Sequence, residues 1–286
     1  MFVVAGASGN TGKVAAETLL AQGKEVRVLV RSEAAAAPWR RRATEVALAG
    51  LDDVDALTSA LRGAEGAYLL LPPQMDSTQP RADNARRSQG YVKAIEASGV
   101  EHVVFLSSIG AQLVEGSGPI LAVHDAEAGL TASRADATFL RAAYFMENWG
   151  GSLYGLAQGT LPGFLAADAA IPMVATLDIG TTAARLLVEG GRGKRAVQLS
   201  GPREYSPRDV ATALGRITGK PVELQVGPIE AMAGALQGAG LNAAWAGLYQ
   251  EMARGLNEGR VIWEQGQAQV RGTTDIEAVL RRLLSA

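Results

Sequence analysis

The sequence predicts an α/β protein built on a doubly wound parallel β-sheet with helices on both faces. Short apolar runs recur along the first 150 residues, with helix-length stretches between them. Strands that alternate with helices in this way form right-handed βαβ units and a parallel sheet. The runs at residues 67–71 and 102–106 are nearly continuous, which is typical of strands buried on both faces.

Six strands and four helices are expected in the first half of the chain. Each strand is a short apolar run, and each helix is an amphipathic stretch between two runs. The carboxyl ends of parallel strands share one edge of the sheet, and ligands bind beyond that edge. We place the strands at residues 2–5, 25–30, 44–48, 66–71, 102–107 and 136–141, and the helices at 11–22, 53–62, 80–98 and 122–133.

The pattern changes after about residue 150, where glycines interrupt a stretch that we expect to be rich in loops. Ser206 is suited to cap a helix, because Pro207 follows it in the first turn. We therefore expect a first domain at residues 1–150 and a smaller α/β lobe at 151–286, partly interleaved with it. The elements expected in this lobe are helices at 178–190 and 207–218, a strand at 196–200 and glycine-interrupted helices in 227–260.

Composition limits the possible partners. The 286 residues suffice for one large or two unequal domains. The 27 basic and 29 acidic residues give a net charge of −2, so no nucleic acid or membrane is an expected partner. The chain has no cysteine and only two histidines, so we expect no disulfide, no thiol nucleophile and no metal site. No signal peptide or membrane span is evident, and a cytoplasmic location is the default expectation.

A glycine-rich turn joins the first strand to the first helix, with Gly6, Gly9 and Gly12 spaced three residues apart. Gly6 permits a sharp exit from the strand, Gly9 permits close approach to a phosphate, and Gly12 permits close packing of the helix on the strand. The helix N-terminus then faces the phosphates. This context favours a dinucleotide pyrophosphate site over an ordinary glycine-rich turn. The side-chain donors beside it are Ser8, Asn10 and Thr11.

The second strand ends at Arg31. An acidic residue here would bond the 2′-hydroxyl of NAD, whereas arginine suits the 2′-phosphate of NADP. We therefore expect NADP(H), with a solvated strand-end charge as the alternative. The nearby run Arg40–Arg42 is expected to be a solvated helix face, and a position over the adenosine is its alternative.

The segment Thr138–Asn148 is distinctive. Together with residues 6–12, 29–31, 70–73 and 105–108, it resembles the NmrA-like family of atypical short-chain dehydrogenases, close to the bacterial NADPH-dependent quinone oxidoreductases and near the triphenylmethane reductases. The resemblance covers nearly the whole chain. It implies a Rossmann-type NADP-binding domain and a substrate lobe, with Leu71, Pro72 and Pro73 beside the ribose and nicotinamide.

Two departures from the family pattern affect the site. Gly50 stands where the family often has an aspartate near the adenine, although Leu51 remains suited to pack on the ring. Family members often carry His or Lys four residues before a glutamate on the helix after the fifth strand. Here His124 precedes Glu127 by three residues, so Glu127 matches the family position and His124 is displaced by one.

The chemistry expected is hydride transfer to a quinone or a similar flat conjugated acceptor. No Tyr-x-x-x-Lys sequence occurs, which argues against simple alcohol dehydrogenation. A quinone needs less help, because it accepts hydride directly and its oxyanion is delocalised. We expect Tyr144 to line the acceptor slot and Ser107 to bond the nicotinamide or the substrate oxygen.

A proton donor is the remaining requirement of a quinone reductase. His124 is the best candidate, since histidine titrates near neutral pH. We expect Glu127 to orient its imidazole from the same helix face, with a surface histidine as the alternative. His102 is expected to be structural.

Other functions remain open at the level of sequence. The missing Tyr-x-x-x-Lys fits equally a non-catalytic sensor that binds the dinucleotide and signals to a protein partner, as NmrA itself does within the family. A reductase of a dye, an imine or a sugar nucleotide is a further alternative. The substrate is in each catalytic case a small molecule, and a homodimer is possible.

Overall fold

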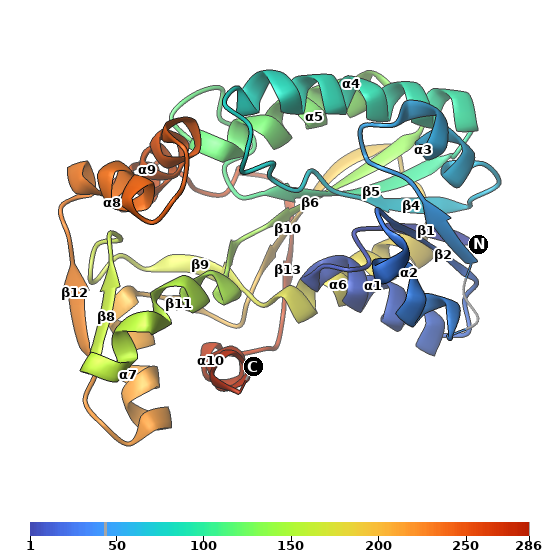
Figure 1. Ribbon diagram of the computed structural model, residues 1–286. Coiled ribbons are helices and arrows are strands. Elements are labelled where there is room, and N and C mark those ends of the chain that lie inside the picture. Colours follow the sequence, from blue (N-terminus) through green and yellow to red (C-terminus); the bar gives the residue numbers. More distant parts are fainter. Residues whose placement is uncertain (43–44, 286) are drawn as a thin grey trace.

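The computed structural model describes residues 1–42 and 45–285, and an eight-stranded sheet lies at its centre (Figure 1). All its pairings are parallel, which confirms the predicted doubly wound sheet. The strand order reverses between β4 and β1, and such a switch point is where this kind of sheet binds ligands. The strands, in order across the sheet, are β13 (Ala268–Arg271), β10 (Lys194–Ser200), β6 (Asp136–Ala142), β5 (His102–Ser108), β4 (Gly66–Leu69), β1 (Phe2–Ala5), β2 (Val26–Val30) and β3 (Glu45–Leu48).

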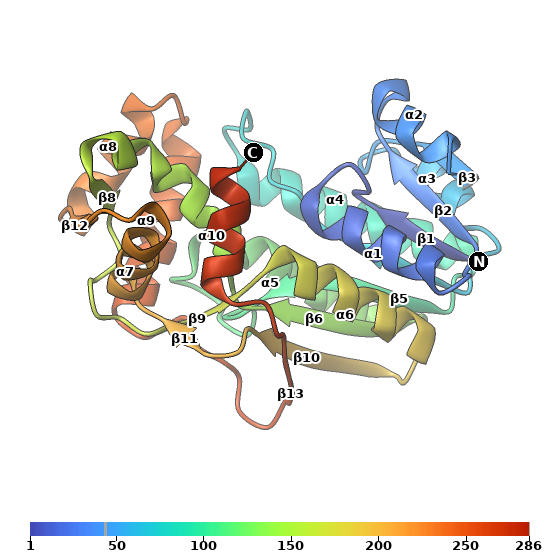
Figure 2. The ribbon, with the colours of Figure 1, turned by 90° about the horizontal axis from the view of Figure 1, so that it is seen from below.

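Helices cover both faces of this sheet (Figures 1 and 2). Along β1, Val4 lies in one hydrophobic core and Val3 and Ala5 lie in another, because successive side chains of a strand point to opposite faces. The helices on the Val4 face are α1 (Asn10–Ala21), α2 (Glu33–Arg40) and α6 (Thr176–Glu189), and those on the other face are α3 (Val54–Leu61), α4 (Pro80–Ser98) and α5 (Leu121–Ala132).

The predicted elements of the first half are present, with small shifts at their ends. Residue 44, the expected start of the third strand, lies outside the described residues. β4 ends at Leu69 rather than at residue 71, so Leu70 and Leu71 already belong to the loop beyond the sheet edge. The sequence analysis missed α2, which contains Pro38 and begins with Ser32 as its N-cap.

The second lobe has two small sheets of its own and a third hydrophobic core. β6 continues almost directly into β7 of this lobe, so the carboxyl edge of the main sheet faces it. The small sheets are β11 (Glu204–Tyr205), β9 (Ile171–Val174) and β7 (Tyr144–Phe145), and β12 (Glu223–Val226) with β8 (Thr160–Gly163). The helices are η1 (Gly118–Ile120), η2 (Met146–Gln158), α7 (Pro207–Thr218), η3 (Ile229–Ala231), α8 (Met232–Gly238), α9 (Ala243–Asn257) and α10 (Ile276–Leu284).

The second half of the chain also completes the main sheet. The strand expected at 196–200 is β10, which pairs with β6, and β13 pairs with β10. The helix expected at 178–190 is α6, which packs on α1. The sequence analysis missed β13 and α10 entirely, and it assigned loops where η2 runs.

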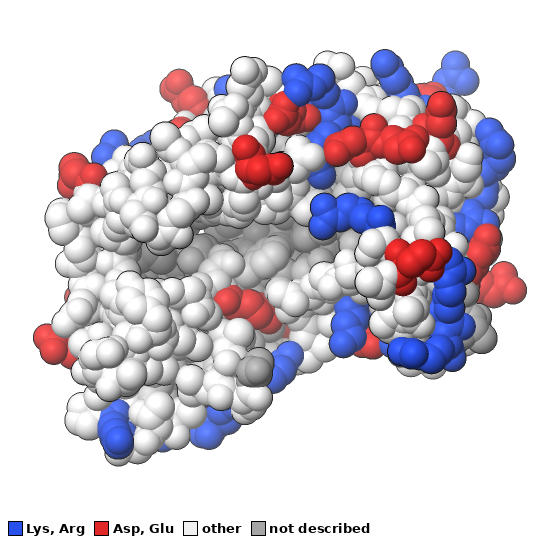
Figure 3. All heavy atoms as spheres, in the orientation of Figure 1, with Lys and Arg blue, Asp and Glu red and all other residues white. Residues whose placement is uncertain are grey.

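A hollow opens between the two parts of the molecule (Figure 3). In the shared orientation of Figures 1 and 3, it lies between the elements around α9 above and those around β9 and β11 below. The carboxyl edge of the main sheet borders it. No helix of the described residues is long and apolar enough to cross a bilayer.

Candidate active site

The glycine-rich turn leaves the beginning of α1 open. Gly6 follows β1 with a φ of +67°, a conformation that favours glycine, and its carbonyl oxygen accepts the Gly9 N–H at 2.8 Å. Gly9 is the N-cap of α1, and no side chain of the described residues caps this helix. The first N–H groups of α1 therefore lack partners within the helix, as at helix ends that bind phosphate.

The beginning of α1 is held tightly between β1 and α6. A Cβ atom on Gly12 would lie 2.4 Å from the carbonyl oxygen of Gly6 and 2.5 Å from that of Ala5. A Cβ atom on Gly180 of α6 would lie 2.6 Å from the carbonyl oxygen of Thr11. The close approach expected at Gly12 is thus present, and Gly180 is a second close approach that the sequence analysis missed.

The three side-chain donors predicted beside the turn differ in orientation. Ser8 and Asn10 are exposed at the opening of α1. Thr11 is buried, and its hydroxyl accepts a hydrogen bond from the Tyr68 hydroxyl at 3.0 Å. The Thr11 side chain is thus directed to Tyr68, and the backbone N–H of Thr11 lies at the open end of α1.

Arg31 is exposed at the end of β2 and has no ion-pair or hydrogen-bond partner among the described residues. Two nearby arginines form ion pairs. Arg40 pairs with Glu33, and Arg42 pairs with Glu17. Arg40 and Arg42 are thus solvated and paired with nearby carboxylates, whereas the Arg31 guanidinium is available to a ligand.

The loops after β3 and β4 form the next part of the edge. Leu51 and Leu71 are half-buried against the same core. The buried Arg87 of α4 joins the two loops, because its Nη1 donates to the carbonyl oxygen of Pro72 at 2.9 Å and its Nε lies 2.9 Å from the Asp52 carboxylate. A groove of about 500 Å³ lies beside this arginine. Arg87 was not predicted, because no sequence motif indicates that an arginine on a helix is buried.

The β4–α4 loop is also held from the second lobe. The indole Nε1 of Trp245 donates to the carbonyl oxygen of Gln74 at 2.7 Å. The side-chain amide of Asn242 donates to the carbonyl oxygens of Met75 and Ser77 at 2.7 and 2.9 Å. Pro72 and Pro73, which are half-buried, therefore belong to a loop that is fixed at both ends.

At the other end of the edge, Ser107 belongs to a buried ionic network. Ser107 and Arg141 are paired positions of β5 and β6. The Ser107 hydroxyl donates to Oε1 of Glu127 at 2.5 Å, and Arg141 donates to both carboxylate oxygens of Glu127 at 2.9 and 2.6 Å. Burial opposes the charge of Arg141, but Glu127 and Glu264 outweigh it and raise the pKa of this guanidinium. Because the Ser107 hydroxyl donates its one proton to Glu127, any further hydrogen bond of this hydroxyl is one that it accepts.

The predicted pairing of Glu127 with His124 is wrong. Glu127 points to Arg141 and Ser107, and Nδ1 of His124 donates instead to the carbonyl oxygen of Ala111 at 2.8 Å. A buried guanidinium offers the carboxylate a bidentate charged partner, which prevails over a neighbour on the same helix face. The bond at Nδ1 leaves Nε2 of the half-buried His124 as the nitrogen available to a substrate.

Tyr144 lies where β6 passes into the second lobe. Burial raises the pKa of Tyr144 to about 12, against a smaller lowering effect of the Asn148 side chain. The hydroxyl therefore keeps its proton at neutral pH and is suited to donate a hydrogen bond. Glu147, from the same distinctive segment, accepts the Thr176 N–H at 2.9 Å and so caps α6.

Glu264 completes the network from far along the chain. Its carboxylate accepts a hydrogen bond from Nη1 of Arg141, and its backbone carbonyl oxygen accepts one from the Gln198 amide at 2.7 Å. The sequence analysis missed Glu264, since no motif surrounds it and 123 residues separate it from Arg141.

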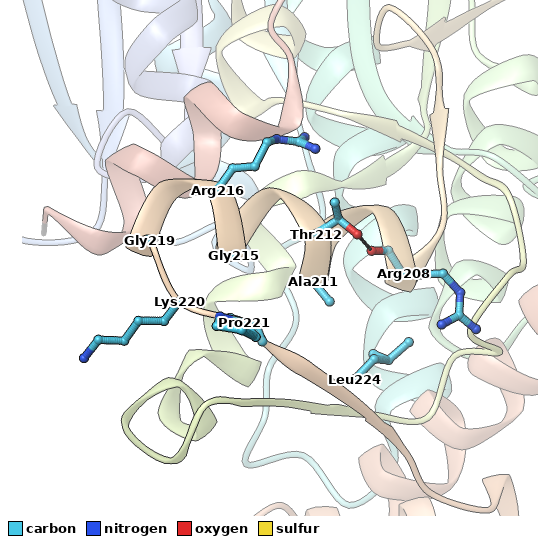
Figure 4. Close-up of a pocket in the computed structure, with 10 residues that line it drawn as sticks. Arg208, Ala211, Thr212, Gly215, Arg216, Gly219, Lys220, Pro221 and Leu224 are labelled. Atoms are coloured by element: carbon cyan, nitrogen blue, oxygen red, sulfur yellow. Dashed lines mark hydrogen bonds between the residues drawn. The ribbon is translucent and has the colours of Figure 1, made fainter.

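A second groove, of about 690 Å³, lies on α7 and β12 in the second lobe. Arg208, Arg216 and Lys220 diverge from it (Figure 4). Arg208 and Arg216 are paired with Asp168 and Glu277. It contains none of the predicted site residues, and its polar groups do not converge on a ligand. Among residues 1–42 and 45–285, no group of three or more metal-ligating side chains is placed to hold a metal ion.

Residues 1–258 match the sequence profile of the NmrA-like family. The chain belongs to this family. Two relatives of known activity are similar to this chain over most of its length. Quinone oxidoreductase 2 of Escherichia coli is 26% identical over 266 residues, which cover 91% of this chain and 89% of that protein. A (4-alkanoyl-5-oxo-2,5-dihydrofuran-3-yl)methyl phosphate reductase of Streptomyces griseus is 29% identical over 226 residues, covering 79% of this chain and 76% of the relative.

A solved structure shows the same fold. The NADPH-dependent quinone oxidoreductase of Escherichia coli, in complex with NADPH, superposes with a TM-score of 0.84 at 25% identity and covers 99% of this chain and 100% of its own. The Rossmann-type architecture and the family resemblance predicted from the sequence are therefore both confirmed.

Proposed function

We propose that this member of the NmrA-like family is an NADPH-dependent oxidoreductase that transfers hydride to a quinone or a similar flat conjugated acceptor. The observation that carries the proposal is the combination of an uncapped α1 N-terminus with Arg31, which follows the adjacent strand and has no partner among the described residues. One group suits a pyrophosphate and the other suits a 2′-phosphate.

The described residues fit the cofactor along the whole sheet edge. Gly6, Gly9 and Gly12 shape the phosphate site, with Ser8 and Asn10 at its rim and the Thr11 N–H at the helix end. Arg31 would bond the 2′-phosphate, and Leu51 would pack on the adenine. Leu71, Pro72 and Pro73 would flank the ribose and nicotinamide. Bound there, NADPH supplies the hydride.

The chain's own groups at the reactive end have separate roles. Ser107 would accept a hydrogen bond, because its own hydroxyl proton is already donated in the hydrogen bond to Glu127. Tyr144 keeps its proton and would donate a hydrogen bond to the acceptor oxygen. His124, with Nδ1 bound to Ala111, would give a proton from Nε2 as an imidazolium. None of these groups is the tyrosine–lysine pair of alcohol dehydrogenases, which fits an acceptor that needs little activation.

The relatives support the reductase class and leave the acceptor open. They are named for a quinone, a furan-derived phosphate and, in the NAD(P)H azoreductase of Xenophilus azovorans at 24% identity, an azo compound. A flat conjugated acceptor is common to a quinone and an azo dye, and this is the class we propose.

The test is NADPH oxidation followed at 340 nm with 1,4-benzoquinone, 1,4-naphthoquinone and an azo dye. We expect acceptor-dependent turnover with at least one quinone and much weaker turnover with NADH. Tight NADPH binding without turnover of any acceptor would contradict the proposal and favour a redox sensor. His124→Gln is expected to lower kcat at least tenfold while leaving the NADPH dissociation constant within twofold; an unchanged kcat would remove His124 from the mechanism.

A further inference from the structure

Nine of the ten residues between α9 and β13 form a segment that the family match does not include. We call residues 259–267 the strap; the matched region ends at residue 258. In Figure 1 the strap leaves α9 and passes the ends of β6 and β10 on its way to β13.

The strap is hydrogen-bonded to residues that neighbour the reactive end. Glu264 contacts Arg141 through its carboxylate and Gln198 through its carbonyl oxygen. The carbonyl oxygen of Ile262 accepts a hydrogen bond from Gln112 at 2.9 Å, next to Ala111, which holds His124. The strap is therefore bonded beside His124 at one point and beside Ser107 and Glu127 at another.

Packing fixes the strap as firmly as these bonds do. Val261 is buried, and a Cβ atom on Gly110 would lie 2.9 Å from its Cγ1 atom. Trp263 is half-buried and packs against both the core under the main sheet and the core of the second lobe. Ile262 remains 52% exposed. The strap thus presents an apolar side chain at a rigid position.

Glu264 also gives the strap a charge. Two carboxylates, Glu127 and Glu264, face the single guanidinium of Arg141. Glu127 and Arg141 are buried, whereas the Glu264 side chain is 37% exposed. The cluster therefore carries one more negative charge than positive charge, and its exposed carboxylate is that of Glu264.

We infer that the strap is the substrate-facing wall of the reactive end, and that Glu264 makes this wall select neutral flat acceptors over anionic ones. The inference rests on the proposed function, because it assigns specificity to the same site. A neutral ring would lie against the apolar strap without penalty. A sulfonated or carboxylated ring would bring a second negative charge toward Glu264.

Binding of two naphthalenes tests the charge without requiring turnover. Naphthalene-2-sulfonamide is neutral and naphthalene-2-sulfonate is an anion of nearly the same shape. Calorimetry on the NADP-loaded protein is expected to show about fivefold weaker binding of the sulfonate. Glu264→Gln is expected to bring the two dissociation constants within twofold of each other, mainly by strengthening the binding of the sulfonate.

Glu258→Gln is the matched control. It removes one carboxylate just before the strap, where Glu258 pairs with Arg260 rather than with Arg141. The ratio of the dissociation constants of the sulfonamide and the sulfonate should stay at its wild-type value in this variant. An equal change in both variants would show that overall charge governs binding, and no change in Glu264→Gln would overturn the inference.

Two further measurements keep the outcome clear. In the wild type the preference for the neutral ligand should fall as salt is raised from 0.05 to 0.5 M, because screening weakens exposed charges; a preference independent of salt would contradict the inference even if Glu264→Gln failed to fold. The ratio of kcat/KM for 1,4-naphthoquinone to kcat/KM for its 2-sulfonate should change with salt and with Glu264→Gln in the same direction as the binding preference. Absence of all turnover would refute the proposed function, while the two binding ratios would still decide the role of the strap.

Discussion

Arg31 and Arg141 occupy similar places at the carboxyl edge of one sheet and have opposite surroundings. Arg31 follows β2, is exposed and has no partner among the described residues. Arg141 lies near the end of β6, is buried, and contacts Glu127 and Glu264. The first guanidinium is available to a ligand, whereas the second is fully used within the protein.

Under the proposed function, this difference reflects the two ends of one binding edge. At the adenosine end, selectivity requires a charge that meets its partner only when the cofactor binds. At the reactive end, geometry must already be in place, so the charges are buried and satisfied by one another. The two arginines should therefore respond to mutation in opposite ways, one through binding and the other through folding.

Arg141→Met should have the largest effect on stability. It leaves the Glu127 carboxylate buried without its bidentate partner, which costs about 3–5 kcal/mol. Arg31→Met should change stability by less than about 0.5 kcal/mol. Urea denaturation measures both free energies of unfolding. The double variant Arg141→Met/Glu127→Gln should recover a large part of the lost free energy of unfolding. Similar losses of stability in Arg141→Met and Arg31→Met would contradict the difference drawn between the two arginines.

Gly12→Ala and Gly9→Ala should separate packing from binding within the turn. The Gly12 substitution forces a Cβ atom to 2.4 Å from a carbonyl oxygen, and overpacking of this kind costs about 1–3 kcal/mol. At Gly9 the nearest atom is 3.4 Å away and φ is −101°, so the protein should fold normally and lose NADPH affinity. The exposed Gly247→Ala in α9 is the control. Normal NADPH affinity in Gly9→Ala would contradict a phosphate site at this turn.

The groups proposed for the adenosine end could be picked out from the sequence because their determinants are local. Gly6, Gly9, Gly12 and Arg31 fall within two strands and one helix, and each has a meaning that follows from backbone geometry alone. The strand runs of the sheet were predictable for the same reason. The orientation of Thr11 was not, because Tyr68, its partner, comes from a strand 57 residues away.

The reactive end was only partly predictable because its partners are distant in sequence. Ser107, Glu127 and Tyr144 were proposed for this end from the sequence, but Glu127 was assigned to His124 by helix spacing, whereas its partner in the structure is Arg141. Glu264 lies in a segment without periodicity. The edge strand β13 was missed because it is only four residues long and its residues are mostly exposed. α10 was missed although Asp275 caps it and Ile276, Val279 and Leu280 form a buried face.

Arg87→Met tests whether the adenosine end is also organised in advance. It removes the bond to the Pro72 carbonyl and the ion pair with Asp52, and stability should fall by about 1 kcal/mol. The KM for NADPH should rise several-fold, while kcat at saturating NADPH stays within twofold. A fall in kcat with an unchanged KM would place the effect of Arg87 at the reactive end instead.

His102 should give the smallest effect, confined to acidic pH. Burial, and then the charge of Arg195, lower the pKa of His102 below its ordinary value of 6.5. As the pH falls below 6.5, the unfolded chain binds a proton that the folded protein resists, so stability is lost until the lowered pKa is reached. His102→Asn should show a shallower decrease of Tm in this window and no difference above pH 7. Parallel Tm profiles of the two proteins would exclude this role.

The most direct test is calorimetric titration of the wild type and Arg31→Ala with NADPH and with NADH. The account predicts that the wild type prefers NADPH, and that the substitution weakens NADPH binding by about 1.5–3 kcal/mol, the worth of a charge-assisted contact to phosphate. NADH binding should be nearly unchanged. An equal loss for both coenzymes, or no affinity of the wild type for either, would contradict the claim that α1 and Arg31 hold a phosphorylated dinucleotide.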